Sequence, residues 1–82
     1  MLVLPLRSEL EDYLKQRNLR KKFDKQRTLF EQNSSHPSLN VELLEPTHLR
    51  FWSFRLDKKY RAIFIFIEPN IVDIVDINNH YR

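Results

Sequence analysis

Two arginines, Arg55 and Arg61, are the side chains whose type and spacing most favour chemistry in this chain. A guanidinium is a planar fork of N–H donors that carries a permanent positive charge. If a three-residue loop, Asp57-Lys58-Lys59, connects two antiparallel strands, Arg55 lies directly across from Arg61. Like charges in such a pair destabilise a sheet, and positions that break local rules are where function is expected.

A structural alternative explains the same pair without function. One or both arginines would then be neutralised by an aspartate of the following strand, Asp73 or Asp76.

The chain ends in Asn78-Asn79-His80-Tyr81-Arg82, whose side chains donate, accept, stack or carry charge. A frayed polar terminus is the default interpretation of such an ending.

A strongly basic segment lies between Lys15 and Arg27. It holds seven lysines and arginines and one acid, Asp24, although the whole chain has a net charge of only +3. A surface of this kind favours a polyanionic partner, because each neutralised phosphate releases counterions. A solvated helix face is the alternative interpretation of the same residues.

Length and composition exclude several classes of protein. The 82 residues predict one domain, residues 1–82, with a thin core. Without cysteine the chain has neither a disulfide framework nor a thiolate metal site, and its three histidines are too scattered for a zinc site. No stretch approaches the ~20 apolar residues of a membrane span. We therefore expect a soluble, cytoplasmic protein with no metal and no cofactor.

The first half of the chain is predicted to be mainly helical. A short strand over Leu2–Leu6 comes first, and Ser8 with Glu11 forms a capping box that predicts a helix beginning at Ser8. Asn18 is predicted to end this helix and to cap the next one. The second helix has a narrow apolar stripe made of Leu19, Phe23, Leu29 and Phe30. Residues 33–38 form a loop by composition.

The second half is predicted to be a three-stranded antiparallel meander. Its strands, dense in aromatic and β-branched residues, are Phe51–Leu56, Tyr60–Ile67 and Ile71–Ile77. The three-residue loop gathers large apolar side chains on one face, in the pairs Trp52–Phe64, Phe54–Ala62 and Leu56–Tyr60. The third strand is ambiguous, because either orientation places one of its aspartates on each face. The pattern predicts an α+β fold, with two N-terminal helices packed on one face of a small antiparallel sheet.

Several short motifs occur in a definite order along nearly the whole chain. They are Ser8–Leu14, the loop His36-Pro37-Ser38-Leu39, then Phe51-Trp52-Ser53, Arg55, Tyr60-Arg61 and a terminal His80-Tyr81. Together they resemble the RelE/ParE superfamily of bacterial toxins, and within it most closely the YoeB-type ribosome-dependent mRNA interferases. Each motif is weak by itself, but their order and the closing His-Tyr pair make the combination specific.

The resemblance implies a microbial RNase fold and the toxin of a type II toxin–antitoxin system. Toxins of this type cleave mRNA in the ribosomal A site without metal, by attack of the 2′-hydroxyl on the adjacent phosphorus. The 5′-oxygen is expelled and a 2′,3′-cyclic phosphate remains. Such chemistry needs a base, an acid and fixed positive charge on the phosphorane. The implied partners are a cognate antitoxin protein, mRNA and the ribosome, with no membrane and no small-molecule cofactor.

Matching positions imply a role for each candidate residue. Glu42 matches the base, with Glu45 as its substitute if the register slips; the alternative is a solvent-facing Glu42 on a short helical turn. His80 matches the position of the acid, and histidine suits this role because its ordinary pKa lies near neutrality. Arg61 matches the phosphate-binding arginine, assisted by Arg55, and Tyr81 would stack on or orient a base. The residues expected to hold ribosomal RNA or the mRNA backbone are Lys21, Lys22, Lys25 and Arg27.

The sequence also departs from the family pattern. It contains no glycine, and Thr47-His48-Leu49-Arg50 stands where the family usually has one before the aromatic-Trp-Ser motif. Phe54 replaces a basic residue of close relatives, so we expect one phosphate contact to be missing, and Arg82 extends past the terminal tyrosine. Other members of the superfamily poison DNA gyrase, and a degenerate member would only bind its antitoxin and repress its operon. Those functions and a small RNA-binding domain without chemistry are the alternatives, and the terminal His-Tyr pair favours the RNase.

Overall fold

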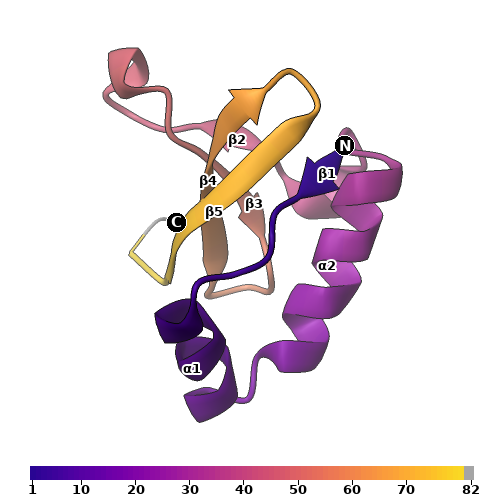
Figure 1. Ribbon diagram of the computed structural model, residues 1–82, viewed down its shortest axis with the longest axis vertical. Helices are drawn as coiled ribbons and strands as arrows, with labels where there is room; N and C mark the ends of the chain where they lie inside the picture. Colours follow the sequence, from indigo (N-terminus) through magenta and orange to yellow (C-terminus); the bar gives the residue numbers. More distant parts are fainter. Residues whose placement is uncertain (81–82) are drawn as a thin grey trace.

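A computed structural model describes residues 1–80, so Tyr81 lies outside the described residues (Figure 1). The two helices are α1 (Ser8–Gln16) and α2 (Arg20–Gln32). The strands are β1 (Leu2–Val3), β2 (Glu42–Leu43), β3 (Trp52–Arg55), β4 (Arg61–Glu68) and β5 (Ile71–Asn78). Two short 3-10 turns, Pro37–Leu39 and Thr47–Leu49, flank β2. The predicted α+β fold is confirmed.

The sheet extends the predicted meander at both edges. Its strand order is β1-β5-β4-β3-β2, with β1 parallel to β5 and every other pair antiparallel. The first strand is shorter than predicted, because Pro5 has no N–H to continue a ladder. On its outer side the Val3 N–H donates to a Glu31 carboxylate oxygen at 2.9 Å, which ties this edge to α2. The opposite edge, β2, was not predicted.

The register predicted for the first hairpin is confirmed. Trp52 lies opposite Phe64, Phe54 opposite Ala62, and Arg55 opposite Arg61. Both helices pack on the apolar face of this hairpin (Figure 1), where the Phe30 ring of α2 stacks on Phe54 with ring centroids 5.0 Å apart. The most deeply buried side chains of this core are Leu14, Phe23, Phe30, Leu39, Phe54, Ala62, Phe64, Val72, Ile74 and Ile77. The other face of the hairpin carries the two arginines.

A bulge resolves the orientation of β5. Ile63 lies opposite Asp76 while Phe64 lies opposite Ile74, so Val75 is one residue more than the ladder needs. The extra residue changes the alternation, and Val72, Ile74 and Ile77 are therefore all buried against the helices. The expectation that each face receives one aspartate is wrong, because Asp73 and Asp76 both lie across from residues of the arginine face.

The helix boundaries agree with the sequence better than the helix caps do. Helix α1 begins at Ser8, but its N-cap is Arg7 and no side chain caps it, so the predicted capping box is wrong. The Ser8 hydroxyl instead contacts the Glu9 carboxylate at 3.4 Å. Asn18 ends α1 in a left-handed conformation with φ 56°, while the N-cap of α2 is Leu19. Asn18 is thus a C-terminal break and not a cap for α2.

Among residues 1–80 of this glycine-free chain, three residues occupy left-handed backbone positions. They are Asn18, Asn40 and Arg50, with φ of 56°, 44° and 58°. Asparagine tolerates this region because its short side chain bonds locally, and glycine tolerates it best. Arg50 directly precedes the Phe51-Trp52-Ser53 motif, in the segment where the resemblance led us to expect a glycine. The backbone at Arg50 adopts the left-handed conformation that glycine favours, although the residue is an arginine.

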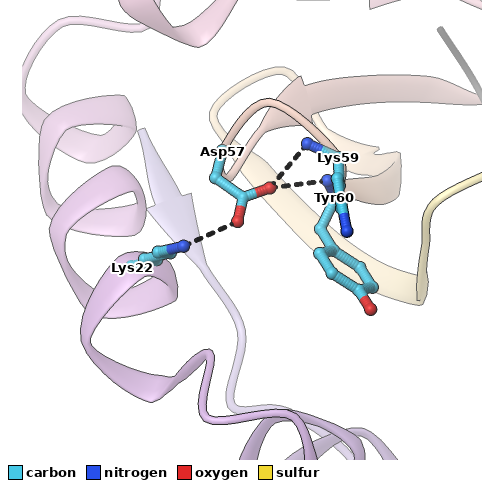
Figure 2. Close-up of polar contacts among 4 residues, drawn as sticks. All are labelled: Lys22, Asp57, Lys59 and Tyr60. Carbon is cyan, nitrogen blue, oxygen red and sulfur yellow. Dashed lines mark hydrogen bonds and ion pairs between the residues drawn. The ribbon is translucent and has the colours of Figure 1, made fainter.

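The three-residue turn between β3 and β4 is held by Asp57 (Figure 2). One carboxylate oxygen accepts from the Lys59 and Tyr60 N–H groups at 2.8 and 2.7 Å, and the other accepts from Lys22 Nζ at 2.8 Å. Burial alone would raise the pKa of Asp57, but these hydrogen bonds outweigh it and hold the pKa below its ordinary value. Asp57 thereby stabilises the conformation of the three-residue turn, and the pairing of Arg55 with Arg61 depends on that turn.

Replacing Asp57 by asparagine is expected to lower the free energy of unfolding by about 1–2 kcal/mol at neutral pH. A carboxyl whose pKa is lowered by folding stabilises the protein fully above its unfolded pKa, about 3.9 for aspartate. That contribution is lost as the pH falls through the lower folded pKa. The difference between wild type and Asp57→Asn in urea unfolding should therefore shrink steadily below about pH 4. Asp12→Asn, an exposed change on α1, is the control; an equal effect there would contradict the role of the turn.

Candidate functional site

A buried cation, Arg61, is the centre of the candidate site. It is the first residue of β4 and its surface is only 4% exposed. Its Nε donates to the Ser53 hydroxyl at 2.8 Å, and its Nη2 donates to the backbone carbonyl of Asn40. These contacts with described residues use two of the five N–H donors of the guanidinium. A further acceptor with two oxygens, such as a phosphoryl group, fits the remaining donors.

Strand β2 places Glu42 beside this cation. Glu42 pairs with Ser53, and Ser53 pairs with Ile63, so the three residues form one row across the arginine face. The Glu42 carboxylate lies 3.9 Å from Arg61 Nη2 and is 44% exposed, while Asn40 Nδ2 donates to it at 3.2 Å. Glu42 is therefore not on a helical turn, and its carboxylate adjoins Arg61 at a position open to solvent.

The electrostatics of Arg61 are those of a destabilised charge. Burial lowers the pKa of its guanidinium, the nearby Glu42 carboxylate opposes this shift, and the Arg55 charge adds to it. Arginine nevertheless stays protonated at any physiological pH. An anion bound beside Arg61 and Arg55 would offset the cost of burying the Arg61 charge and the repulsion between the two arginines.

Aspartates do not neutralise the arginine pair, so the structural alternative is wrong. Asp73 pairs with Arg7, whose Nη2 lies 2.7 Å from the carboxylate. Asp76 accepts from Asn78 Nδ2 at 2.6 Å. Arg55 is exposed next to Arg61, and its backbone carbonyl accepts from the buried Gln26 of α2 at 2.8 Å. Helix α2 therefore holds β3, the strand that carries Arg55, from the face opposite the arginines.

The end of β5 brings His80 to the same end of the sheet. Asn78, the last residue of β5, lies opposite Arg61, and its Oδ1 accepts from the His80 N–H at 3.1 Å. Two residues of chain span at most about 7 Å, so His80 begins close to the row of Arg61. Its imidazole is exposed. The role of His80, like those of Glu42 and Arg55, remains a prediction, and Tyr81 is outside the described residues.

The basic residues of α2 lie on the other side of the sheet from Arg61. Lys21 and Lys25 are exposed, and Arg27 is half-buried. Lys22 contacts Asp57, and a neighbouring cation of the same helix, Arg20, contacts Glu11 and Asp24. The fold therefore places the cations of α2 and the Arg55–Arg61 pair on opposite faces of the sheet. Their proposed role in RNA binding remains a prediction.

Two partners of Arg61, namely Ser53 and Asn40, were not among the residues predicted from the sequence. Ser53 is fully buried on the arginine face, and its alternation with Phe54 would have placed it there once the register was known. The Asn40 carbonyl gave no such signal, because a backbone acceptor is invisible in a sequence.

Two negative findings apply to the described residues. Among residues 1–80, no group of histidine, aspartate and glutamate side chains is arranged to hold a metal ion. Within the same range, neither helix has the length and apolar character needed to cross a membrane.

Comparison with known proteins identifies the fold. No protein-family model and no curated protein sequence matches the chain. It is similar to chains in two solved structures, a heterotetrameric YoeB-YefM toxin-antitoxin complex and a YoeB-YefM complex, both from Staphylococcus aureus. Each match has a TM-score of 0.67 and 19% identity, and covers 98% of this chain and 94% of the other. At this identity the similarity establishes a YoeB-like fold.

Proposed function

We propose that this protein is the toxin of a bacterial type II toxin–antitoxin system and an endoribonuclease that cleaves mRNA in the ribosomal A site. The observation that carries the proposal is the buried Arg61 guanidinium with the Glu42 carboxylate 3.9 Å away, on the open face of a YoeB-like sheet. A positive phosphate seat with an adjacent solvent-accessible base is what RNA cleavage by an internal hydroxyl requires.

The proposed reaction transfers two protons and breaks one P–O bond. Glu42 takes the proton of the 2′-hydroxyl as the 2′-oxygen attacks the adjacent phosphorus. Arg61, assisted by Arg55, holds the phosphoryl oxygens, where negative charge grows in the phosphorane. The P–O5′ bond then breaks, and His80 gives its proton to the leaving oxygen. The products are a 2′,3′-cyclic phosphate and a free 5′-hydroxyl.

The geometry around Arg61 supports this division of roles. A phosphate held by the free donors of Arg61 lies within reach of Glu42, because carboxylate and guanidinium are already neighbours. Arg61 cannot rotate away, since Ser53 and the Asn40 carbonyl hold its Nε and Nη2. Such a fixed cation needs little reorganisation when charge develops, which is the source of electrostatic catalysis. Tyr81 would stack on or orient a base beside the reacting phosphate.

The proposed partners follow from the same chemistry. The substrate is mRNA presented by the ribosome, and the basic side chains of α2 would contact RNA backbone without selecting sequence. The reaction as proposed uses protein side chains alone and takes place in the cytoplasm, with the ribosomes. An antitoxin protein would inhibit the toxin, as the YoeB-YefM complexes suggest.

Replacing His80 by alanine is expected to abolish growth arrest and to lower A-site cleavage by about 10²-fold, because the leaving oxygen loses its acid. Cleavage is measured by primer extension on mRNA in purified translating ribosomes, and ribosome binding by co-sedimentation. Binding should remain close to that of wild type, which separates a catalytic role from loss of folding. His48→Ala, an exposed histidine of the Thr47–Leu49 turn, is the matched control.

The same assays decide against the alternatives. A wild-type protein that leaves mRNA intact while gyrase-dependent DNA breaks accumulate would be a gyrase poison, and the RNase proposal would fail. A protein that does neither and only binds its antitoxin would be catalytically degenerate. Equal cleavage by wild type and His80→Ala would remove His80 from the mechanism.

A further inference from the structure

A second positive surface lies around the turn between β3 and β4, on the helix side of the sheet. There a hollow of about 540 Å³ is lined by the cations Arg17, Lys22, Lys58 and Lys59, by Tyr60 and by Asp57, over the buried Leu19. We call it the turn hollow. Its volume is in the range of known ligand sites, about 300–1,000 Å³. Three separate segments of the chain contribute its cations, so the fold itself gathers them.

The acid in the turn hollow is already fully used. Both Asp57 oxygens accept hydrogen bonds, from Lys22 on one side and from the Lys59 and Tyr60 N–H groups on the other (Figure 2). Asp57 therefore offsets the charge of Lys22 and fixes the backbone of the turn. The side chains of Lys58 and Lys59 are exposed beside it. Together with Arg17 they leave the turn hollow with a positive charge.

Aromatic rings complete the turn hollow. The Arg17 guanidinium carbon lies 3.6 Å from the centroid of the Tyr13 ring, a close cation–π contact. Tyr13 in turn meets Tyr60 edge to face, with centroids 6.2 Å apart and planes at 77°. Tyr60 is half-buried and lines the hollow. Cations alternating with aromatic rings are the combination that binds single-stranded nucleic acid, through phosphates and stacked bases.

The turn hollow continues directly from the candidate active site. Arg55 and Arg61 are opposite each other at the end of the hairpin, and the turn with Lys58 and Lys59 connects them. The four cations lie within seven residues of the chain. They form a row that begins on the arginine face, follows the end of the hairpin and reaches the helix face. A flexible polyanion seated at Arg61 can follow this path. An acidic peptide would satisfy the lysines but would have no counterpart at the phosphate seat.

We infer that the turn hollow binds the single-stranded RNA that flanks the cleaved phosphate, with its backbone on Lys58 and Lys59 and one unstacked base against Tyr60. This inference rests on the proposed function, because it takes RNA as the substrate. The residues of the turn hollow take no part in the chemical step. It holds the strand beside the reacting phosphate and so raises affinity and orients the substrate.

Binding of a short fluorescein-labelled single-stranded RNA to the full-length protein, followed by fluorescence anisotropy across a series of salt concentrations, tests the inference. Lys58→Gln and Lys59→Gln should each reduce the salt slope by about 0.7, and the double variant should bind at least about tenfold more weakly at low salt. Tyr60→Leu should weaken binding by about fivefold or more, and Tyr60→Phe should restore it. Lys15→Gln removes an equally exposed charge that lies outside the turn hollow and is the matched control.

The outcomes separate this inference from the proposed function. If Lys58→Gln and Lys59→Gln bind RNA like Lys15→Gln, while Arg61→Gln still loses cleavage, the turn hollow is no RNA site and the RNase proposal stands. If wild type binds no RNA at low salt and cleaves none on ribosomes, both fail. If an oligoglutamate peptide binds in a Lys58- and Lys59-dependent way and RNA does not, the partner is a protein and the inference is overturned. Circular dichroism melts verify that each variant is folded.

Discussion

Replacing Arg61 by glutamine is expected to lower the rate of mRNA cleavage on translating ribosomes by about 10³-fold, because the fixed cation beside the reacting phosphate is lost. The side chain is buried and held by Ser53 and Asn40, so no neighbouring lysine or arginine can take its place without rebuilding the strand. Single-turnover cleavage on ribosomes carrying one defined codon in the A site measures the effect. It reports on the chemical step and not on product release.

Two further variants separate charge from geometry. Arg61→Lys keeps the charge but loses the planar fork, and should recover only part of the lost rate. Arg55→Gln should lower the cleavage rate by only about tenfold, because Arg55 is exposed and solvent screens its charge. A folded Arg61→Gln protein that cleaves at the wild-type rate would remove Arg61 from the mechanism, and the phosphate seat with it.

Replacing Phe54 by alanine is expected to lower the free energy of unfolding by about 3–5 kcal/mol. Phe54 is completely buried, stacks on Phe30 at 5.0 Å and contacts Phe64 at 5.9 Å between ring centroids. A domain of this size has a total stability of about 4–12 kcal/mol, so the variant would lose a large share of it. Urea unfolding followed by the fluorescence of Trp52, the single tryptophan, measures the change.

Two controls accompany this experiment. Phe66→Ala removes the same side chain from a position that is 41% exposed, and should cost much less. Phe54→Lys places a basic residue at this position and should destabilise at least as much as alanine, because it buries an unpaired charge. Phe54 lies on the helix face, away from Arg61, so the expectation that its replacement removed a phosphate contact is wrong. Equal midpoints for Phe54→Ala and Phe66→Ala would contradict the core assignment.

The hairpin shows how much of the fold could be predicted. Alternation has a period of two residues and a loop of known length fixes the pairing, so Arg55 could be placed opposite Arg61 from sequence neighbours alone. The apolar stripe of α2 could be predicted for the same reason, because Phe23 and Phe30 recur at helical spacing and are buried. The cap of α1 could not, since the chain enters the helix one residue earlier than a capping box at Ser8 requires.

Some features of the candidate site could likewise be predicted from the sequence, and others could not. The pairing of two arginines at the end of a hairpin follows from the local sequence, because register is a local property. Which of the two is buried, and what surrounds it, depends on tertiary packing. Arg61 is enclosed by the Asn40 carbonyl, 21 residues away along the chain, and adjoins Glu42 through the two-residue strand β2. Such contacts depend on how distant segments pack, and the segment before β3 has no periodicity that would reveal its path. The bulge in β5 also depends on tertiary packing, because the extra residue, Val75, brings Val72, Ile74 and Ile77 to the face that the helices cover.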